Sequence, residues 1–276
     1  MSLYITPTTS VMNSSSTLVE RVERERYSHT VKDVMAEHNK LKGRFPHNDT
    51  YPSTVRLSDL YQDYMQNLDG LTILDYGCGR GDMALQYLNN GATKIHGIDI
   101  SDVYVAHADE QARKHGFSPD RFDFQVMDAH KLSFPDNSFD IVAGWSILHH
   151  LDAETAMNEV YRVLKPGGRV LFWEPLADHP MLKVFRWLTP QARTVDEAPF
   201  TGTALKRIVE QNNWRSELAY CGLIEGPVAM LTSVLIPNHP DNFLLRIADK
   251  IERWTHEKKI LTSWNQRVLF NLVKQV

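Results

Sequence analysis

The chain has 276 residues, of which 42% are hydrophobic and 23% charged, and its formal net charge is −4. These proportions allow one sizeable core and exclude wholesale disorder. A pI near 6.3 gives no basic surface for phosphate backbones, so we expect no nucleic-acid partner. The two cysteines, Cys78 and Cys221, are too few for a disulfide framework or a cysteine metal cluster, and a reducing compartment suits them.

We expect a cytoplasmic protein without a membrane span. The first residues lack the basic and long apolar regions of a signal peptide. The longest apolar stretch, residues 228–236, is too short to cross a bilayer, and we interpret it as core packing.

Residues 1–16 are polar and rich in Ser and Thr, which is typical of a frayed arm. From Thr17 to Met35 the apolar residues have helical spacing, and the charged residues between them suit a solvated face. A connector with Gly and Pro follows at 42–54. We therefore divide the chain into an N-terminal arm, residues 1–53, and one larger domain, residues 54–276.

After an amphipathic helix at 54–67, the stretch from Leu71 to Asp82 predicts a buried strand, a tight glycine loop and the start of a helix. The apolar run ends in Asp75, and Gly77, Gly79 and Gly81 follow at alternate positions. Glycine adopts positive φ and permits close approach of a ligand to the backbone. The next helix start offers free N–H groups to an anion.

Two further apolar runs also end in a carboxylate, Asp99 and Asp128. Asp99 lies 24 residues after Asp75, where an acid can accept both hydroxyls of an adenosine ribose. A plain turn or helix-capping role for Asp99 is the alternative. The glycine spacing does not follow the Gly-x-Gly-x-x-Gly pattern typical of nicotinamide enzymes, which argues against that cofactor.

Strands and helices alternate from Thr72 to Glu174, which predicts parallel βαβ units. Residues 176–200 interrupt this order with three prolines and several bulky apolar residues, and we interpret them as an insertion that roofs the pocket at the carboxyl ends of the strands. A helix at 203–213, a strand at 217–223, a helix at 241–256 and a strand at 265–273 complete the chain.

Five ordered motifs between Thr72 and Glu174 together resemble the class I S-adenosylmethionine-dependent methyltransferases of the small-molecule type. They are Asp-x-Gly-x-Gly-x-Gly at 75–81, the acid at 99, Asp128-Ala129, the run Pro135–Asp140, and Leu-Lys-Pro-Gly-Gly at 164–168. The resemblance implies a Rossmann-like seven-stranded, mostly parallel sheet with helices on both faces and an antiparallel last strand. It also implies that the N-terminal helix is a lid over the cofactor.

The resemblance further implies which residues bind S-adenosylmethionine and its product S-adenosylhomocysteine. Asp75, Gly77 and Gly79 would hold the methionine end and Asp99 the ribose. Asp128 would accept from the adenine amino group, the Ala129 backbone would read the ring edge, and Ile100 or Met127 would provide apolar walls. The set also includes Trp145, at the end of the fourth strand, and Tyr27 from the lid.

His149 and His150 follow the fourth strand, beside the expected position of the transferred methyl group. Histidine titrates near neutral pH, so one of them is a candidate general base if the acceptor carries a proton. We favour His150, because it lies further past the strand end. Structural roles in capping and core packing are the alternative. No ligand spacing around this pair indicates a metal site.

The most consistent function is methyl transfer to an oxygen, nitrogen or carbon of a small, fairly apolar metabolite. A quinone or lipid-precursor methyltransferase acting at a membrane surface is the first alternative. A cofactor-binding scaffold without catalysis is the second, although a scaffold needs none of the acids at 75, 99 and 128.

Overall fold

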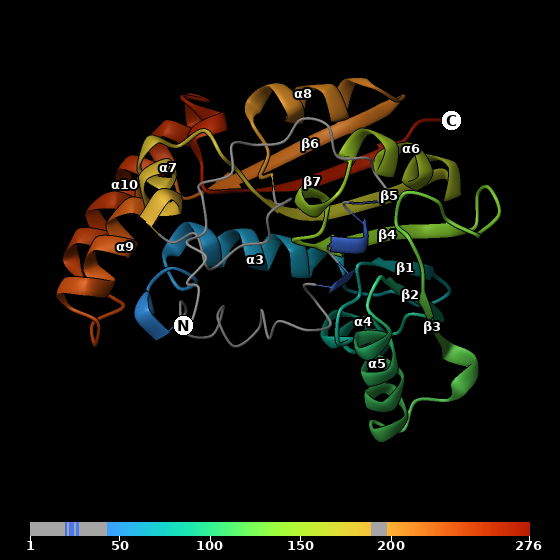
Figure 1. Ribbon diagram of the computed structural model, residues 1–276. Coiled ribbons are helices and arrows are strands. Elements are labelled where there is room, and N and C mark those ends of the chain that lie inside the picture. Colours follow the sequence, from blue (N-terminus) through green and yellow to red (C-terminus); the bar gives the residue numbers. More distant parts are fainter. Residues whose placement is uncertain (1–19, 21, 25, 28–42, 189–197) are drawn as a thin grey trace, which may run out of the picture.

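The computed structural model describes residues 20, 22–24, 26–27, 43–188 and 198–276. Seven strands form one sheet in the order β3-β2-β1-β4-β5-β7-β6 (Figure 1). Strands β1 to β5 are parallel, and β7 runs antiparallel between β5 and β6. The strands are β1 (Thr72–Tyr76), β2 (Lys94–Asp99), β3 (Phe122–Val126), β4 (Phe139–Trp145), β5 (Leu164–Pro175), β6 (Trp214–Cys221) and β7 (Arg267–Lys274). The expected fold class, with its antiparallel last strand, is confirmed.

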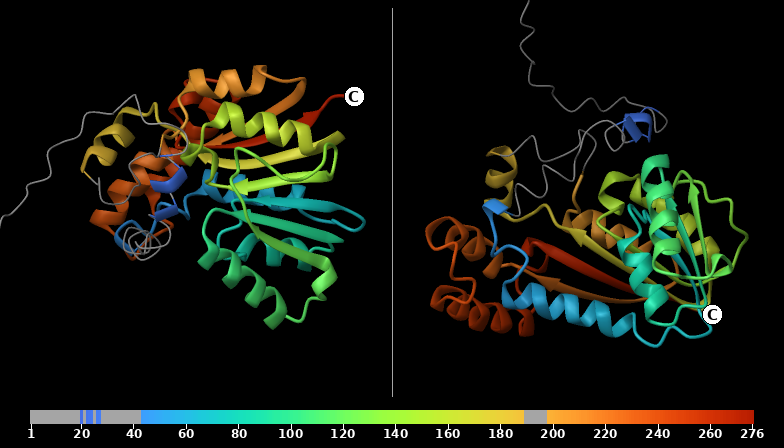
Figure 2. Two further views of the ribbon diagram at one scale, coloured as in Figure 1. Left: turned by 45° about the vertical axis from the view of Figure 1, so that its right-hand side comes forward. Right: turned by 90° about the horizontal axis from the view of Figure 1, so that it is seen from below.

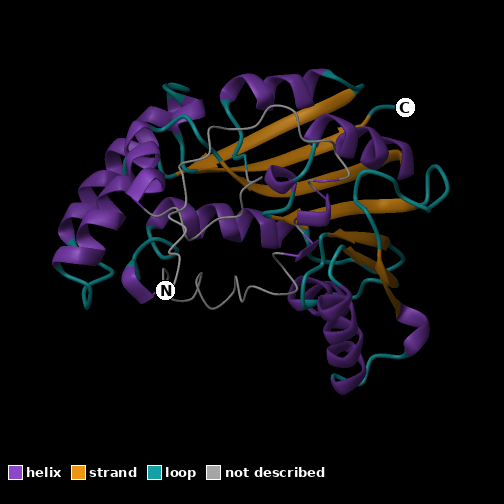
Figure 3. Ribbon diagram, in the orientation of Figure 1, coloured by secondary structure: helices purple, strands orange, loops and turns teal. Residues whose placement is uncertain are grey.

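Helices cover both faces of the sheet (Figures 2 and 3). One face carries α3 (Pro52–Tyr64), α4 (Asp82–Asn89) and α5 (Asp102–Lys114), and the other carries α6 (Ala153–Val163) and α8 (Gly202–Glu210). The alternation of side chains along β1 explains the two cores: Ile73 packs in one apolar cluster and Leu74 in the other. Parallel strands buried on both faces require such continuous apolar runs.

Three more helices, α7 (Pro180–Leu188), α9 (Glu225–Leu235) and α10 (Phe243–Glu257), lie at one end of the sheet (Figure 1). The sequence predicted α10 but missed α9. The core interpretation of residues 228–236 is wrong, because Leu231, Val234 and Leu235 are exposed. The buried side chains of α9 are small or polar, and this inverted pattern hid the helix from a reading based on apolar periodicity.

Residues 47–51, which lie before the expected domain boundary at 53, pack on the larger domain. His47 is buried, with Nδ1 2.9 Å from the Thr232 hydroxyl, and its backbone N–H donates to the Ser233 hydroxyl. The Tyr51 ring is fully buried and its hydroxyl donates to Gln266 at 2.5 Å. This connector therefore adds to the core, while the division of the chain into arm and domain stays a prediction.

The described parts of the insertion close on each other. Leu176 and Phe200 form a bridge, and the N–H of Ala177 donates to the carbonyl of Phe200 at 2.9 Å. Leu176 and Phe200 are also buried in one of the two apolar clusters. These contacts join the two ends of the insertion at one place, directly after β5. Residues 189–197 lie outside the described part of the chain.

Candidate active site

The three glycines after β1 all have positive φ, but for different reasons. A Cβ on Gly77 would lie 2.6 Å from the Ile147 side chain, and one on Gly81 would lie 2.9 Å from Ala108. Only Gly79 faces open space, with no atom within 4 Å of an added Cβ. Gly77 and Gly81 therefore permit close packing of the protein on itself, and Gly79 is the position at which a ligand can approach the backbone.

Asp75 is a buried carboxylate at the carboxyl end of β1. The N–H of Ala84 stabilises its charge, whereas Oδ2 is buried without a hydrogen-bond partner in the described part of the protein. Burial, followed by repulsion from Asp99, raises the pKa of Asp75 to about 7. An unpaired buried carboxylate oxygen is costly, so this geometry suits a cationic ligand group that pairs with it.

Asp99, at the end of β2, links the glycine loop to the start of α5. Its Oδ2 accepts from the N–H of Gly79 at 3.0 Å, and its Oδ1 accepts from the N–H of Ser101 at 2.9 Å. The helix cap itself is Ser101, whose hydroxyl accepts from the Tyr104 N–H. The turn-stabilising role of Asp99 therefore exists together with its place beside the loop, next to the half-buried Ile100.

Asp128 belongs to a polar chain that holds the loop after β3. Its Oδ1 accepts from the backbone N–H of His130 and lies 2.7 Å from His130 Nδ1. His130 Nε2 accepts from the N–H of Asp152, which fixes the proton on Nδ1. The neighbouring carbonyl of Ala129 accepts from the buried Tyr76 hydroxyl. Oδ2 of Asp128 takes no part in this chain.

Trp145, the last residue of β4, lies in an aromatic cluster. Its ring stacks on Trp173 of β5 with centroids 4.4 Å apart, and the Tyr61 ring of α3 meets it edge-on at 5.4 Å. Trp173 and Tyr61 are buried, whereas Trp145 is 38% exposed. The indole of Trp145 is thus an exposed aromatic surface on a rigid base at the same sheet edge as Asp75.

His149 forms a buried pair with Glu174, a residue that sequence reasoning missed. Its Nδ1 lies 2.8 Å from Glu174 Oε2, while Oε1 accepts from the N–H groups of Ile147 and Leu148, each at 2.9 Å. The chain enters this turn through Ser146, which has a φ of +56°. Glu174 ends an apolar strand as Asp75, Asp99 and Asp128 do, so the same criterion applied to β5 would have found it.

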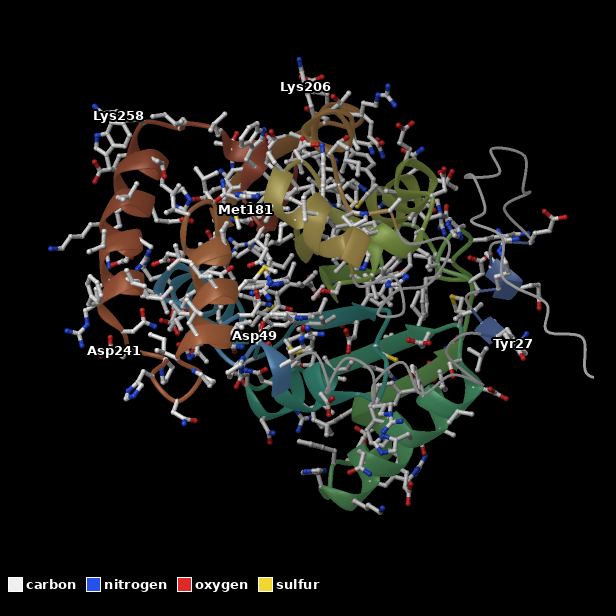
Figure 4. All side chains as sticks on the ribbon, turned by 60° about the vertical axis from the view of Figure 1, so that its left-hand side comes forward. Tyr27, Asp49, Met181, Lys206, Asp241 and Lys258 are labelled. Carbon is white, nitrogen blue, oxygen red and sulfur yellow. The ribbon has the colours of Figure 1, made fainter. Side chains whose placement is uncertain are left out.

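The backbone of His149 is also fixed, because its carbonyl accepts from the N–H of Ala198 at 2.8 Å. The returning end of the insertion is thereby attached to the histidine turn. His150 is half-buried, and its ring centroid lies 4.2 Å from that of His149. Tyr27 is 63% exposed (Figure 4), and most of its predicted lid helix lies outside the described residues.

A family model described as "Methyltransferase domain" matches residues 73–168, which span the glycine loop and all three strand-end acids. Residues 73–168 therefore match a methyltransferase domain, the kind of domain that the five ordered motifs resemble. The unpaired oxygen of Asp75 and the open space at Gly79 fit the methionine end of S-adenosylmethionine, which carries a sulfonium, an ammonium and a carboxylate group. In the described residues no cluster of His, Cys, Asp and Glu suits a metal ion.

Curated relatives of the methyltransferase domain act on different molecules. The chain is 31% identical over 172 residues to 27-O-demethylrifamycin SV methyltransferase of Amycolatopsis mediterranei, covering 62% of this chain and 60% of that protein. It is 26% identical over 208 residues to demethylmenaquinone methyltransferase of Lactococcus lactis, covering 72% and 77%. The chain thus spans less than two thirds of the length of the rifamycin relative.

Solved structures share the fold of the methyltransferase domain. Haemonchus contortus phosphoethanolamine N-methyltransferase 2 matches with a TM-score of 0.61 at 19% identity, covering 92% of this chain and 60% of that one. The [4+2]-cyclase SpnF matches with a TM-score of 0.54 at 24% identity, covering 80% of both chains. One fold thus carries proteins named for different reactions.

Proposed function

We propose that this protein transfers a methyl group from S-adenosylmethionine to an oxygen, nitrogen or carbon of a small, fairly apolar metabolite. The observation that carries the proposal is Asp75, a buried carboxylate with an unpaired oxygen at the head of the glycine loop. A ligand without an N–H or O–H donor leaves that oxygen unsatisfied, whereas the ammonium of S-adenosylmethionine satisfies it with a charge-assisted hydrogen bond.

The other acids then have separate roles in this proposal. Asp99, held by two backbone N–H groups, accepts the ribose hydroxyls. Oδ2 of Asp128 and the backbone of Ala129 read the adenine edge, and Ile100 covers the ring. Trp145 presents its indole face to the sulfonium end of the ligand, where an aromatic face attracts a cation.

The bound cofactor supplies an electrophilic methyl group, and the protein aligns the acceptor and removes its proton where there is one. We propose His149 as the base in preference to His150. Glu174 holds the proton on Nδ1, which leaves Nε2 as the basic nitrogen, and Nε2 forms no hydrogen bond within the described residues. Distance past the strand end, on which the preference for His150 depended, does not orient a ring, whereas the Glu174 pair does. Glu174 is a positioning residue.

The insertion, residues 176–200, and the N-terminal lid would close over the acceptor and set its identity. The link from Ala198 to His149 supports this, since it joins the insertion directly to the proposed base. Buried Leu176, Leu182 and Phe200 anchor the insertion in the protein interior.

A quinone or lipid-precursor methyltransferase is the second candidate. The exposed apolar side chains of α9 and α10 favour it, and one relative is named a demethylmenaquinone methyltransferase. A non-catalytic scaffold is less consistent with the geometry, because the His149–Glu174 pair is not needed to bind the cofactor.

Incubation of the protein with isotope-labelled S-adenosylmethionine and a metabolite extract, followed by mass spectrometry, tests the proposal. Transfer of label to a product of modest polarity is expected. Tight binding of S-adenosylhomocysteine without any labelled product would favour the scaffold and contradict the enzyme.

With the acceptor in hand, pH–rate profiles of His149→Ala and His150→Ala test the base. A hydroxyl or ammonium acceptor predicts a fall in kcat of about 10²–10⁴-fold for His149→Ala, with unchanged affinity for S-adenosylhomocysteine. This loss shrinks at high pH, because the acceptor then ionises unaided. A uniform small loss at every pH would mean that His149 is structural, and a larger effect at His150 would reverse the preference.

A further inference from the structure

Helices α9 and α10 are inverted relative to the usual amphipathic pattern. The buried side chains of α9 include Glu225, Thr232 and Ser233, while Leu231, Val234 and Leu235 are exposed. Leu235 is 64% exposed. A helix in contact with water normally exposes the polar set and buries the apolar one. The exposed side of α9 is therefore suited to an apolar neighbour.

Helix α10 repeats this inversion in its second half. It buries Leu245 and Ala248 in its first half but Glu252 and Thr255 in its second, and along its length it exposes an apolar row spaced for one helix face. The row is Phe243, Ile247, Ile251 and Trp254, with Leu244 beside it. Leu261 and Trp264 extend the exposed apolar surface beyond the end of the helix.

The two helices form one surface. They pack against each other, and Figure 4 shows α9 beside α10, whose ends are marked by Asp241 and Lys258. On α10, Asp249 pairs with Arg56 of α3, and Glu252 accepts from the N–H groups at the start of α9. Helical spacing places Ile247 and Ile251 on the side of α10 away from Asp249. We call the exposed leucines and valine of α9, together with the apolar row of the adjoining α10, the α9–α10 face.

Basic residues border this face although the whole chain is acidic. Residues 243–261 contain five Lys and Arg against three Asp and Glu, whereas the chain has a net charge of −4. One of those acids, Glu252, is buried, and its carboxylate accepts hydrogen bonds from four backbone N–H groups. The exposed Lys250, Lys258 and Lys259 have no ion pair within the described residues.

The α9–α10 face lies at the same end of the protein as the candidate active site. Strand β6 is parallel to β5, because both run antiparallel to β7. Helix α9 therefore begins at the sheet edge where β1, β4 and β5 present Asp75, Trp145 and Glu174.

We propose that the α9–α10 face docks the protein on an anionic lipid bilayer. An apolar strip flanked by lysines, with tryptophans at its end, has the composition of helices that lie in a membrane interface. A second copy of the chain fits less well, since lysine is depleted in protein interfaces, while it gains about fivefold in affinity per residue at an anionic bilayer surface. Within the described residues no helix is long and apolar enough to cross a membrane, so the docking is peripheral.

Sedimentation with phosphatidylcholine vesicles, with and without phosphatidylglycerol, tests the docking without cofactor or acceptor. The protein should bind the anionic vesicles, bind neutral ones far less, and release with added salt. The double variant Ile247→Ser/Ile251→Ser should lose about tenfold or more in partitioning. Val103→Ser, at an exposed apolar residue of α5, is the matched control and should change nothing.

Charge reversal and fluorescence give independent readouts. Lys258→Glu/Lys259→Glu should lower anionic binding by about fivefold for each lysine, and Lys206→Glu on α8 should not. Brominated lipids should quench Trp254, a signal that Trp254→Phe removes. All variants should bind S-adenosylhomocysteine as the parent does, so loss of docking is separable from loss of the proposed methyl transfer.

No binding to anionic vesicles would overturn the proposal, as would equal, salt-insensitive binding to both vesicle types. A third contrary outcome is a dimer in light scattering that the Ile247→Ser/Ile251→Ser variant no longer forms, from a protein that does not bind vesicles. That outcome assigns the face to a second copy of the chain.

Discussion

At the scale of a single residue, the environment of Asp75 favours the binding of a cationic ligand group. The fold removes its carboxylate from water and leaves one oxygen without a partner, at an energetic cost that a cationic ligand group relieves. Glu174 has the opposite environment, because both its oxygens are hydrogen-bonded, one to two backbone N–H groups and the other to His149. Asp75 therefore has an oxygen available to a ligand, whereas Glu174 is hydrogen-bonded within the protein and orients His149.

The raised pKa of Asp75 predicts pH-dependent cofactor binding. The ammonium of S-adenosylhomocysteine pairs with the ionised carboxylate, whereas the free protein holds a proton there below about pH 7. Affinity should fall by about tenfold per pH unit below 7 and level off above it. Calorimetry in buffers of different ionisation enthalpy should detect proton release at pH 6. Asp75→Asn should bind weakly at every pH, and a parent affinity that is flat from pH 5.5 to 8 would contradict this account.

Asp99→Ala should weaken S-adenosylhomocysteine binding by about 1.5–3 kcal/mol, because it removes a charged acceptor for two hydroxyls. The loss of its bond to the Gly79 N–H also loosens the loop that the ligand approaches. Asp102→Ala is the control, since that exposed acid lies three residues away and, within the described residues, its carboxylate accepts from the N–H of Val103 alone. Calorimetry with S-adenosylhomocysteine on both folded variants tests this role. If Asp99→Ala binds as tightly as Asp102→Ala, Asp99 does not belong to the cofactor site.

At the scale of elements, buried polar groups hold the C-terminal helices together with a few buried apolar residues such as Ala229 and Leu245. Glu252 of α10 accepts from the N–H groups of residues 222–225 at 2.6–3.0 Å, and so caps the start of α9. This capping explains how α9 and α10 stay together while much of their apolar surface faces outward.

Glu252→Gln should lower the free energy of unfolding at pH 7 by roughly 1.5–3 kcal/mol. Hydrogen bonds to its carboxylate hold the pKa of Glu252 at about 2 against the opposing effect of burial. A depressed pKa in the folded state stabilises the protein above the unfolded value of 4.5, and that contribution is lost as the pH falls toward 2. The difference between parent and variant in thermal unfolding should therefore shrink below pH 4.5. Glu257→Gln, exposed on the same helix, should have no such effect; a pH-independent difference at Glu252 would refute the capping account.

At the scale of the whole molecule, one sheet connects the cofactor residues, the histidine turn and the α9–α10 face. All three lie at the carboxyl edge of strands β1 to β6, so ligand binding at one end of the sheet stabilises the fold that carries the others. S-adenosylhomocysteine at 100 times its Kd should add about 2.7 kcal/mol to the stability. For a domain of this size that corresponds to a rise in Tm of roughly 5–10 °C. Differential scanning fluorimetry measures this rise in Tm. If the same ligand concentration raises the Tm of Asp99→Ala as much as that of the parent, the ligand binds elsewhere.

The sequence by itself determined the strand–helix alternation, the glycine loop and the three strand-end acids. These signals are local: an apolar run that ends in a carboxylate, and glycine where φ is positive, can be identified from consecutive residues. The parallel strands followed from the alternation of strands and helices, and the antiparallel last strand from the family resemblance. The site roles assigned to the acids, Tyr27 and the histidines are still predictions.

Only the tertiary structure decided the features that depend on distant neighbours. Residues 149 and 174 meet because β4 and β5 are adjacent and parallel, and nothing near either residue in the chain indicates that pairing. Gly77 is required by Ile147, seventy residues away. Helix α9 escaped prediction because its polar residues are buried against His47 and Glu252, partners from other parts of the chain that periodicity cannot reveal. Local chemistry therefore determines which groups are available, and the packing of remote segments determines which of them are buried, paired or left for a ligand.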